Sequence, residues 1–160
     1  MKAKARRSLF ALAIGSLVVL VAAQTALAHA PSAAAGSGED TSATLIDARF
    51  ADGNFFGSFV VTGVMDGTFD GTYVADVDLI IHPNGRLDAH GFLTFTGSIA
   101  GCDATTVLFS LTSTGAFPEG GGPAVIEGQL VAVGSDVQAN LAFDEVGNFF
   151  TYDGSYHCEQ

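Results

Sequence analysis

The sequence predicts an all-β protein, a single antiparallel up-and-down β-barrel of about eight strands, with a β-sandwich as the alternative. No amphipathic helix pattern follows residue 28. Instead Gly, Asn and Asp recur as turn residues, and β-branched and aromatic residues fill the stretches between them. Several of these stretches are long, and closing a sheet removes its exposed edges, so the pattern favours the barrel.

The N-terminal segment has the three-part form of a secretory signal peptide. A basic start is followed by an apolar run from Leu9 to Val21 and by the small-residue pattern Ala26-Leu27-Ala28. We therefore expect residues 1–28 to be removed and the protein to be secreted or periplasmic, with no membrane attachment afterwards. Residues 29–43 are small and polar and lack an apolar period. They are expected to form a disordered Ala/Ser/Gly tail before a β-barrel domain at 44–160.

Turn residues divide the remaining chain into strands. Turns are expected at 52–54, 66–67, 83–85, 134–135 and 147–148, and a longer Gly/Pro-rich loop at 115–123. The strands between them are expected near residues 44–51, 55–65, 67–82, 86–99, 104–114, 123–133, 136–144 and 147–158.

The turn at 83–85 predicts a register for its hairpin. Pro83 suits the first central position of a type I turn and Gly85 suits the left-handed bulge after it. This register places polar side chains on one face, with His82 opposite Arg86, Ile80 opposite Asp88, and Asp78 opposite His90. The two histidines and two carboxylates resemble a cation site, but Arg86 among them opposes a cation. We interpret this face as solvated and expect no metal and no cofactor.

A short motif occurs twice, as TFDGTY at 68–73 and TYDGSY at 151–156, and the two copies contain all three tyrosines of the chain. Asp66-Gly67 is already a turn, so Gly71 is expected inside a strand. Alternation then puts the aromatic residues and the glycine on the inner face and the acid outside. Two interpretations stay open: the rings cover a strand glycine that lets the sheet coil, or they border a ligand slot.

If the slot exists, its ligand-binding residues are expected to be Phe69, Tyr73, Phe95, Tyr152 and Tyr156. The chain lacks a G-x-S-x-G nucleophile motif and a phosphate-binding loop, so no catalytic residue is predicted. Glu127 is the one weak candidate, because a carboxyl inside an apolar barrel suits acid–base chemistry. We expect it to be exposed, since an unpaired buried carboxylate is unfavourable.

Charge and cysteine content bound the partners and the compartment. All 17 acidic residues but only Arg49 and Arg86 among the fixed cations follow residue 28, which leaves a net charge of 2 − 17 = −15. Such a surface repels nucleic acid and anionic membranes. Counting strand directions places Cys102 and Cys158 at the same end of the barrel, so we expect a disulfide between them, in keeping with export.

The run GTFDGTYVADVDLIIHPNGRLDAHGFLTFTGSIAGC, followed by TTVLFSLTSTGAF and IEGQLVAVGS, resembles bacterial proteins with the allene oxide cyclase-like barrel, a calycin-like group. The resemblance spans roughly residues 55–135 and lies in glycine positions and strand rhythm. It implies an apolar barrel cavity with a few polar groups. Plant members of the group are cyclases, and the similarly built dirigent proteins steer the coupling of phenolic radicals. No position here matches a cyclase catalytic residue.

Three functions follow as hypotheses. The first is a non-catalytic protein that binds a small apolar or aromatic molecule in the barrel. The second is a cyclase, isomerase or dirigent-like enzyme, with Glu127 as its acid–base group. The third is a structural protein whose barrel interior is filled by side chains.

Overall fold

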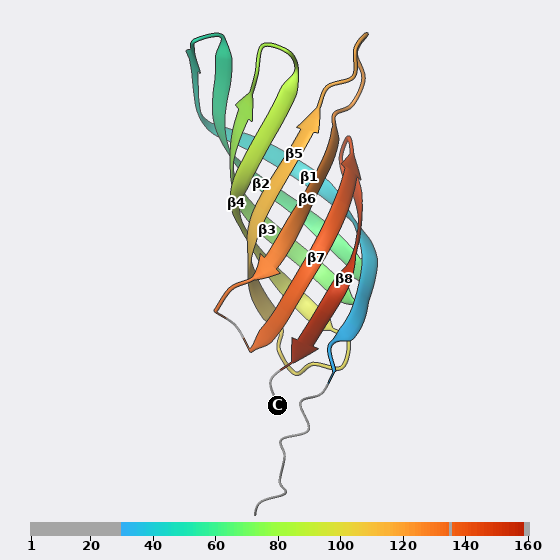
Figure 1. Ribbon diagram of the computed structural model, residues 1–160. Helices are drawn as coiled ribbons and strands as arrows, with labels where there is room; N and C mark the ends of the chain where they lie inside the picture. The colour runs from blue at the N-terminus through green and yellow to red at the C-terminus, as the bar shows by residue number, and fades with distance from the viewer. Residues whose placement is uncertain (1–29, 135, 159–160) are drawn as a thin grey trace, which may run out of the picture.

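The computed structural model describes residues 30–134 and 136–158 and forms a closed antiparallel barrel of eight strands (Figure 1). Each strand pairs with its sequence neighbours, and β8 closes the barrel against β1. The predicted up-and-down barrel is therefore confirmed. The strands are β1 (Ser32–Ala51), β2 (Asn54–Gly67), β3 (Phe69–Ile81), β4 (Arg86–Ile99), β5 (Thr106–Ala116), β6 (Val125–Ala132), β7 (Val137–Val146) and β8 (Phe149–Cys158).

The expected signal peptide at 1–28 lies outside the described residues. Within the described part of the chain, no helix is long and apolar enough to cross a membrane.

The first strand corrects the expected boundary between tail and barrel. Most of the segment predicted to be a disordered tail belongs to β1, which begins at Ser32 and pairs with both β2 and β8. Its inner positions are small because rings of β8 cover them. Gly36 lies opposite Tyr152 and Gly38 lies opposite Phe150, and a Cβ at either glycine would overlap the ring. A strand whose apolar surface comes from its neighbour carries no apolar period of its own.

The hairpin between β3 and β4 has the predicted register. Ile80 pairs with Asp88 and Asp78 pairs with His90, and the His82 N–H donates to the Arg86 carbonyl oxygen at 2.8 Å. Gly85 has a φ of 82°, as the bulge requires. The two glycines of the repeated motif, Gly71 and Gly154, both lie inside strands, so neither Asp-Gly pair is a turn.

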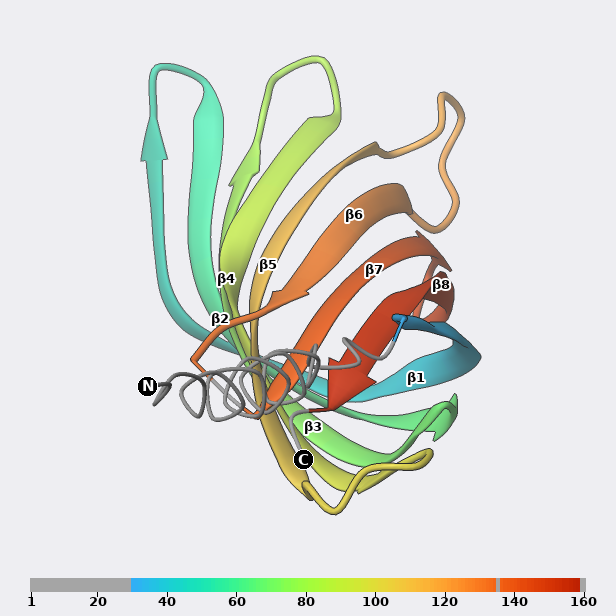
Figure 2. The same cartoon turned by 60° about the horizontal axis from the view of Figure 1, so that its bottom comes forward.

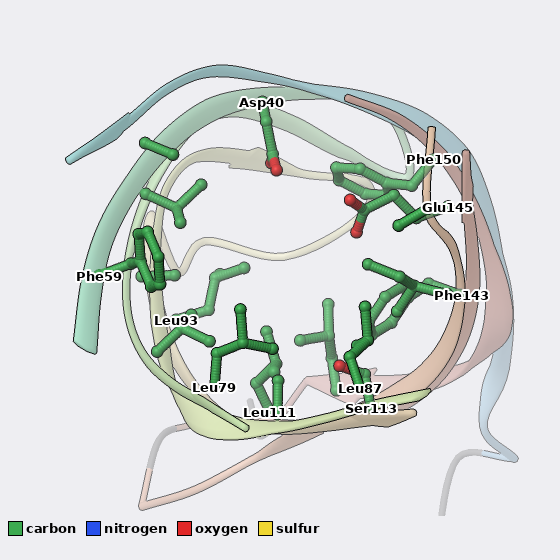
Figure 3. Close-up of a pocket in the computed structure, with 18 of the residues that line it drawn as sticks. Asp40, Phe59, Leu79, Leu87, Leu93, Leu111, Ser113, Phe143, Glu145 and Phe150 are labelled. Atoms are coloured by element: carbon green, nitrogen blue, oxygen red, sulfur yellow. The ribbon is translucent and has the colours of Figure 1, made fainter. Parts of the chain in front are cut away.

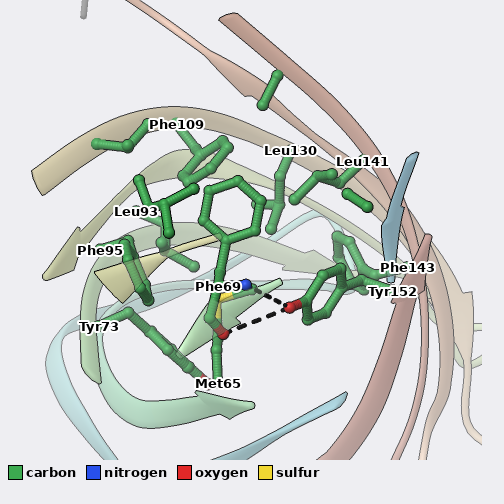
Figure 4. Packing of buried hydrophobic residues seen from close by; sticks show 14 of the residues in the cluster. Met65, Phe69, Tyr73, Leu93, Phe95, Phe109, Leu130, Leu141, Phe143 and Tyr152 are labelled. Atoms are coloured by element: carbon green, nitrogen blue, oxygen red, sulfur yellow. Dashed lines mark hydrogen bonds between the residues drawn. The ribbon is translucent and has the colours of Figure 1, made fainter. Parts of the chain in front are cut away.

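The two ends of the barrel differ in how they are filled. At one end, bulky side chains from six strands converge and exclude solvent (Figure 4). The largest of these fully buried side chains are Phe69, Phe95, Phe109, Met65, Leu130, Leu141, Val107 and Val137. We call this end the plug. At the other end the β1–β2 and β3–β4 hairpins extend beyond the remaining strands and splay outward (Figures 1 and 2).

The predicted disulfide crosses the plugged end. Cys102 lies in the loop between β4 and β5, and Cys158 ends β8, with their Cα atoms 5.8 Å apart. Beside them the Tyr156 hydroxyl donates to the Ala100 carbonyl oxygen at 2.7 Å. The loop that closes this end is therefore attached to the strand that closes the barrel. A disulfide is in keeping with an oxidising compartment.

Candidate functional site: an acidic mouth on an apolar cavity

A cavity of about 430 Å³ occupies the open half of the barrel (Figure 3). Its wall is apolar apart from a few side chains, and this volume lies within the range of small-molecule sites. The polar side chains of the wall are Asp40, Tyr73, Ser113 and Glu145. The apolar ones are Ala43, Phe59, Val61, Ala75, Val77, Leu79, Leu87, Ala89, Leu93, Leu111, Phe117, Ala124, Ile126, Leu130, Phe143 and Phe150.

Asp40 stands where β1 separates from β8. The Asp40 N–H donates to the Asn148 carbonyl oxygen in the β7–β8 turn at 2.8 Å, and the register of β1 shifts between Asp40 and Ser42. Bulges of this kind redirect the side chains around them. Asp40 pairs with Gly63 on β2, so its side chain faces inward. The chain thus places a carboxylate at the rim of an apolar chamber.

Tyr73 reaches Asp40 across a strand that carries no side chain between them. Gly63 pairs with Asp40 on one side and with Tyr73 on the other. A Cβ at Gly63 would overlap the Tyr73 hydroxyl, so only glycine lets the ring lie flat over β2. The Tyr73 hydroxyl donates a hydrogen bond to Asp40 Oδ1. Burial, and next the hydrogen bond to Asp40, raise the pKa of Tyr73, so the tyrosine stays a donor.

Glu145 supplies a second carboxyl beside Asp40. We call the group formed by Asp40, Tyr73 and Glu145 the mouth of the cavity. It continues the inner face of β7 after Phe143 and pairs with Ile126 on β6 and Phe150 on β8. Burial among these neighbours, and secondly the negative charge of Asp40, raise its pKa to about 7. Burial also raises the pKa of Asp40, although the hydrogen bond from Tyr73 opposes this.

The mouth is negative and has no cation of its own. No Lys, Arg or His is among the described residues that line the cavity. Arg49 lies over the Phe56 ring, 4.1 Å from its centroid, and Arg86 donates to Asp88 Oδ1 at 2.8 Å, so both arginines are engaged outside the barrel. A pair of carboxyls in an apolar cavity can attract a cation, or can exchange a proton near neutral pH.

The five residues expected to bind a ligand do not lie together at the cavity. Tyr73 lines it, whereas Phe69 and Phe95 are 0% exposed inside the plug. The Tyr152 hydroxyl accepts the Phe69 N–H at 3.0 Å (Figure 4). It also donates to the Asp66 carbonyl oxygen at 3.2 Å. Tyr156 packs against the same plug. For this half of the barrel, the repeated motif therefore serves packing, and Gly71 and Gly154 let the strands approach closely.

The weak catalytic candidate also lies elsewhere. Glu127 is exposed on the outer face of β6, because Ile126 and Leu130 point inward. The polar side chains of the β3–β4 hairpin bond to one another or to the neighbouring β2. Asp88 accepts from His82 Nε2 at 2.9 Å and from Arg86 at 2.8 Å, and Ser58 on β2 donates to Asp78 at 2.5 Å. Within residues 30–134 and 136–158 no three metal-ligating side chains gather at one point.

Two residues of the mouth escaped the sequence interpretation. Asp40 fell in the segment expected to be a tail. Glu145 came one residue after the expected end of its strand at 144, although the alternation Val137, Ala139, Leu141, Phe143 continues to it. Extending that period by two residues would have placed a carboxyl inside the barrel. For Asp40 no such signal existed, since the preceding inner positions of β1 are Gly36 and Gly38 and no apolar period marks that face.

Comparison of the sequence with protein-family models and with curated proteins finds no match. The fold is an eight-stranded antiparallel barrel compatible with a calycin-like architecture. Such a fold does not by itself define a function.

We expect Glu145→Gln to stabilise the protein at alkaline pH and to have little effect under acid conditions. The pKa of about 7 in the folded protein lies above the ordinary value of 4.5 for a free glutamate. Between these values the unfolded chain loses a proton that the folded protein keeps, so stability falls as pH rises and stays reduced above the folded pKa. Thermal unfolding at about pH 8 should show a Tm raised by about 4 °C, and no increase at about pH 4.

Glu127→Gln is the matched control for this measurement, because it removes the same charge from the exposed face of the adjacent strand. It should change Tm by less than 2 °C or so at either pH. An equal shift in both variants would show that the effect comes from overall charge and not from the mouth.

Proposed function

We propose that this protein is an exported barrel that binds a small, largely apolar molecule in the open half of its lumen, without catalysing a reaction. The observation that supports it most is the contrast between the two halves. The plug is filled to 0% exposure by aromatic rings, whereas the same barrel leaves about 430 Å³ unfilled beside it. Unfilled apolar space lowers stability. Since the same chain packs the plug fully, the open half is better explained by a ligand that fills it than by poor packing.

The inner positions of the open half are small where larger side chains would close it. The cavity is lined by Ala75 on β3, by Ala89 on β4 and by Ala124 in the loop just before β6. The same open end is bordered by an extended hairpin on which Leu45 and Phe59 pair on the inner face. An apolar molecule entering here would meet an apolar surface before the cavity itself. This arrangement argues against a structural barrel with a filled core.

The compartment and the charge fit such a carrier. The signal-like N-terminal sequence and the disulfide support export to a secreted or periplasmic location. The net charge of −15 for the chain after residue 28, from 2 cations and 17 acids, supports a ligand other than nucleic acid or an anionic membrane surface.

A second candidate is an isomerase or cyclase of the allene oxide cyclase-like kind. It is favoured by one observation, a Glu145 carboxyl with a pKa of about 7 in an apolar cavity next to Asp40 and the Tyr73 hydroxyl. Such a group can take up and return a proton at neutral pH. Chemical change of a bound molecule, lost in Glu145→Gln, would distinguish the enzyme from the carrier.

The proposal is tested by filling the cavity with a larger side chain and measuring the binding of N-phenyl-1-naphthylamine. This neutral probe fluoresces in apolar surroundings. Ala89 lies on the cavity wall, so Ala89→Phe should weaken binding about tenfold or more by occupying the space. Ala142→Phe is the matched control, because Ala142 is exposed on the outside of β7. Equal affinities of the two variants would place the probe outside the cavity.

Native mass spectrometry of the protein from its exported fraction supplies an independent readout. A co-purifying small molecule that is absent from Ala89→Phe and present in Ala142→Phe would support the proposal. Absence of any such molecule, together with no binding of the neutral probe to the wild type, would contradict it.

A further inference from the structure

We propose that the natural ligand is a cationic amphiphile, in which a protonated amine is held between Asp40 and Glu145 and an apolar body fills the lumen below. This inference rests on the cavity being a binding site, as proposed above, and adds the chemical class of the ligand.

The two carboxyls project into the same space from β1 and β7, the two strands that flank β8. Asp40 comes from β1 and Glu145 from β7, and both point into the cavity (Figure 3). The β1 strand is held to the β7–β8 turn beside them by the bond from the Asp40 N–H to the Asn148 carbonyl oxygen, and by Asn148 Nδ2 donating to Glu39 Oε1 at 3.2 Å. The backbone at Asp40 is thus attached directly to the turn that follows Glu145.

The protein leaves the charge of the mouth uncompensated. The groups that face Glu145 are Asp40 from β1 and Tyr73 from β3, while its neighbours on β6 and β8 are the apolar Ile126 and Phe150. Within the described part of the chain, no side chain donates a hydrogen bond to Glu145, and Tyr73 is the one side-chain donor to Asp40. Half-buried carboxylates without a positive partner are unfavourable, and a cationic ligand would supply that partner.

An alkylammonium head matches the acceptors that remain. It carries three N–H donors and no acceptor. The mouth has the two Glu145 oxygens and the Asp40 oxygen not used by Tyr73 as acceptors. A calcium ion would need six or more oxygen ligands, whereas two carboxylates are present. A fatty acid or another anion would meet two negative groups, and a neutral molecule would leave both of them unpaired.

Binding of an amine should also be linked to protons. Burial and the charge of Asp40 hold the pKa of Glu145 at about 7, and a cation beside it favours the ionised form. Amine affinity should therefore rise as pH rises through about 7, with release of a proton from the carboxyl on binding. A primary alkylamine stays protonated throughout this range.

The experiment compares three probes with one aromatic body: 1-naphthylmethylamine, 1-naphthylmethanol and 1-naphthoate. The chain has no tryptophan, so naphthalene emission is read without interference. At about pH 8 we expect the amine to bind the oxidised wild-type protein about tenfold more tightly than the alcohol, and the carboxylate to bind more weakly than the alcohol. Between about pH 8 and pH 5 the amine should lose most of this advantage, while affinity for the alcohol stays constant.

Variants assign the effect to the mouth. Glu145→Gln and Asp40→Asn should each reduce amine affinity about tenfold and keep or improve alcohol affinity, which also shows that the cavity is intact. Glu127→Gln, with the same change of net charge on the outer face, should leave all three affinities unchanged.

Equal binding of amine and alcohol to the wild type would overturn the inference and leave the binding function standing. An amine preference that Glu127→Gln reduces as much as Glu145→Gln would overturn it too, because the cause would then be overall charge. Failure of all three probes, together with N-phenyl-1-naphthylamine, to bind would overturn both proposals.

Discussion

Phe69→Ala is expected to lower the free energy of unfolding by about 4 kcal/mol, the typical cost of deleting a buried ring. Phe69 is 0% exposed and packs edge-on against Phe95, Phe109 and Tyr152, with centroids 5.5, 5.6 and 6.1 Å away. Its removal would leave rings from three other strands without their common partner. Denaturant titration should show the lower midpoint with an unchanged slope, and Tm should fall by about 15 °C.

The control is Phe149→Ala, since Phe149 is 58% exposed at the start of β8. It should change stability by less than about 0.5 kcal/mol. Because Phe69 lies below the cavity and not on its wall, the folded Phe69→Ala protein should bind N-phenyl-1-naphthylamine within about threefold of the wild type. A variant that lost binding but kept its stability would instead indicate that Phe69 contacts the ligand, as the sequence motif predicts.

Replacing both cysteines, Cys102→Ser with Cys158→Ser, is expected to cost about 4 kcal/mol. The bridge joins residues 56 positions apart, and a crosslink over such a loop restricts the unfolded chain by that amount in the chain-entropy model. It also attaches the β4–β5 loop to the last strand across the plugged end. Urea unfolding of the double variant should show a lower midpoint and a steeper slope, because the unfolded chain becomes more extended.

Reduction of the wild-type protein provides the matched comparison, since it opens the same bridge without changing the sequence. The free energies of unfolding of the reduced wild type and the double variant should agree to within about 1 kcal/mol. If the oxidised wild type and the double variant were equally stable, the bridge would contribute nothing to the barrel. Probe binding at the far end should survive in the folded double variant.

Much of the barrel could be predicted because its strand signals are local. The Pro83–Gly85 turn and the alternation on either side of it correctly gave the pairing of Ile80 with Asp88. The same alternation correctly placed Ile126 inside and left Glu127 exposed. Each of these inferences depends on neighbours within a few residues along the chain, and the two-residue period of a strand carries them.

The N-terminal half of β1 could not be predicted from such signals. Gly36 and Gly38 look like linker residues until the rings of Tyr152 and Phe150 are placed over them. The same arrangement recurs where Tyr73 covers Gly63 and where Phe143 covers Gly128. In all four cases the glycine and its ring lie on paired strands, so the packing unit is a cross-strand pair and not a segment.

The sequence by itself determined the all-β class, the hairpin register, the inner and outer faces of most strands and the pairing of the two cysteines. Only the tertiary structure decided which inner residues meet at one level of the barrel. Strands in a barrel are tilted and staggered, so residues that share a face in sequence reach different heights inside it. That stagger collects Phe69, Phe95 and Phe109 into the plug, and it leaves alanines around the cavity and brings Asp40 to the same mouth as Glu145.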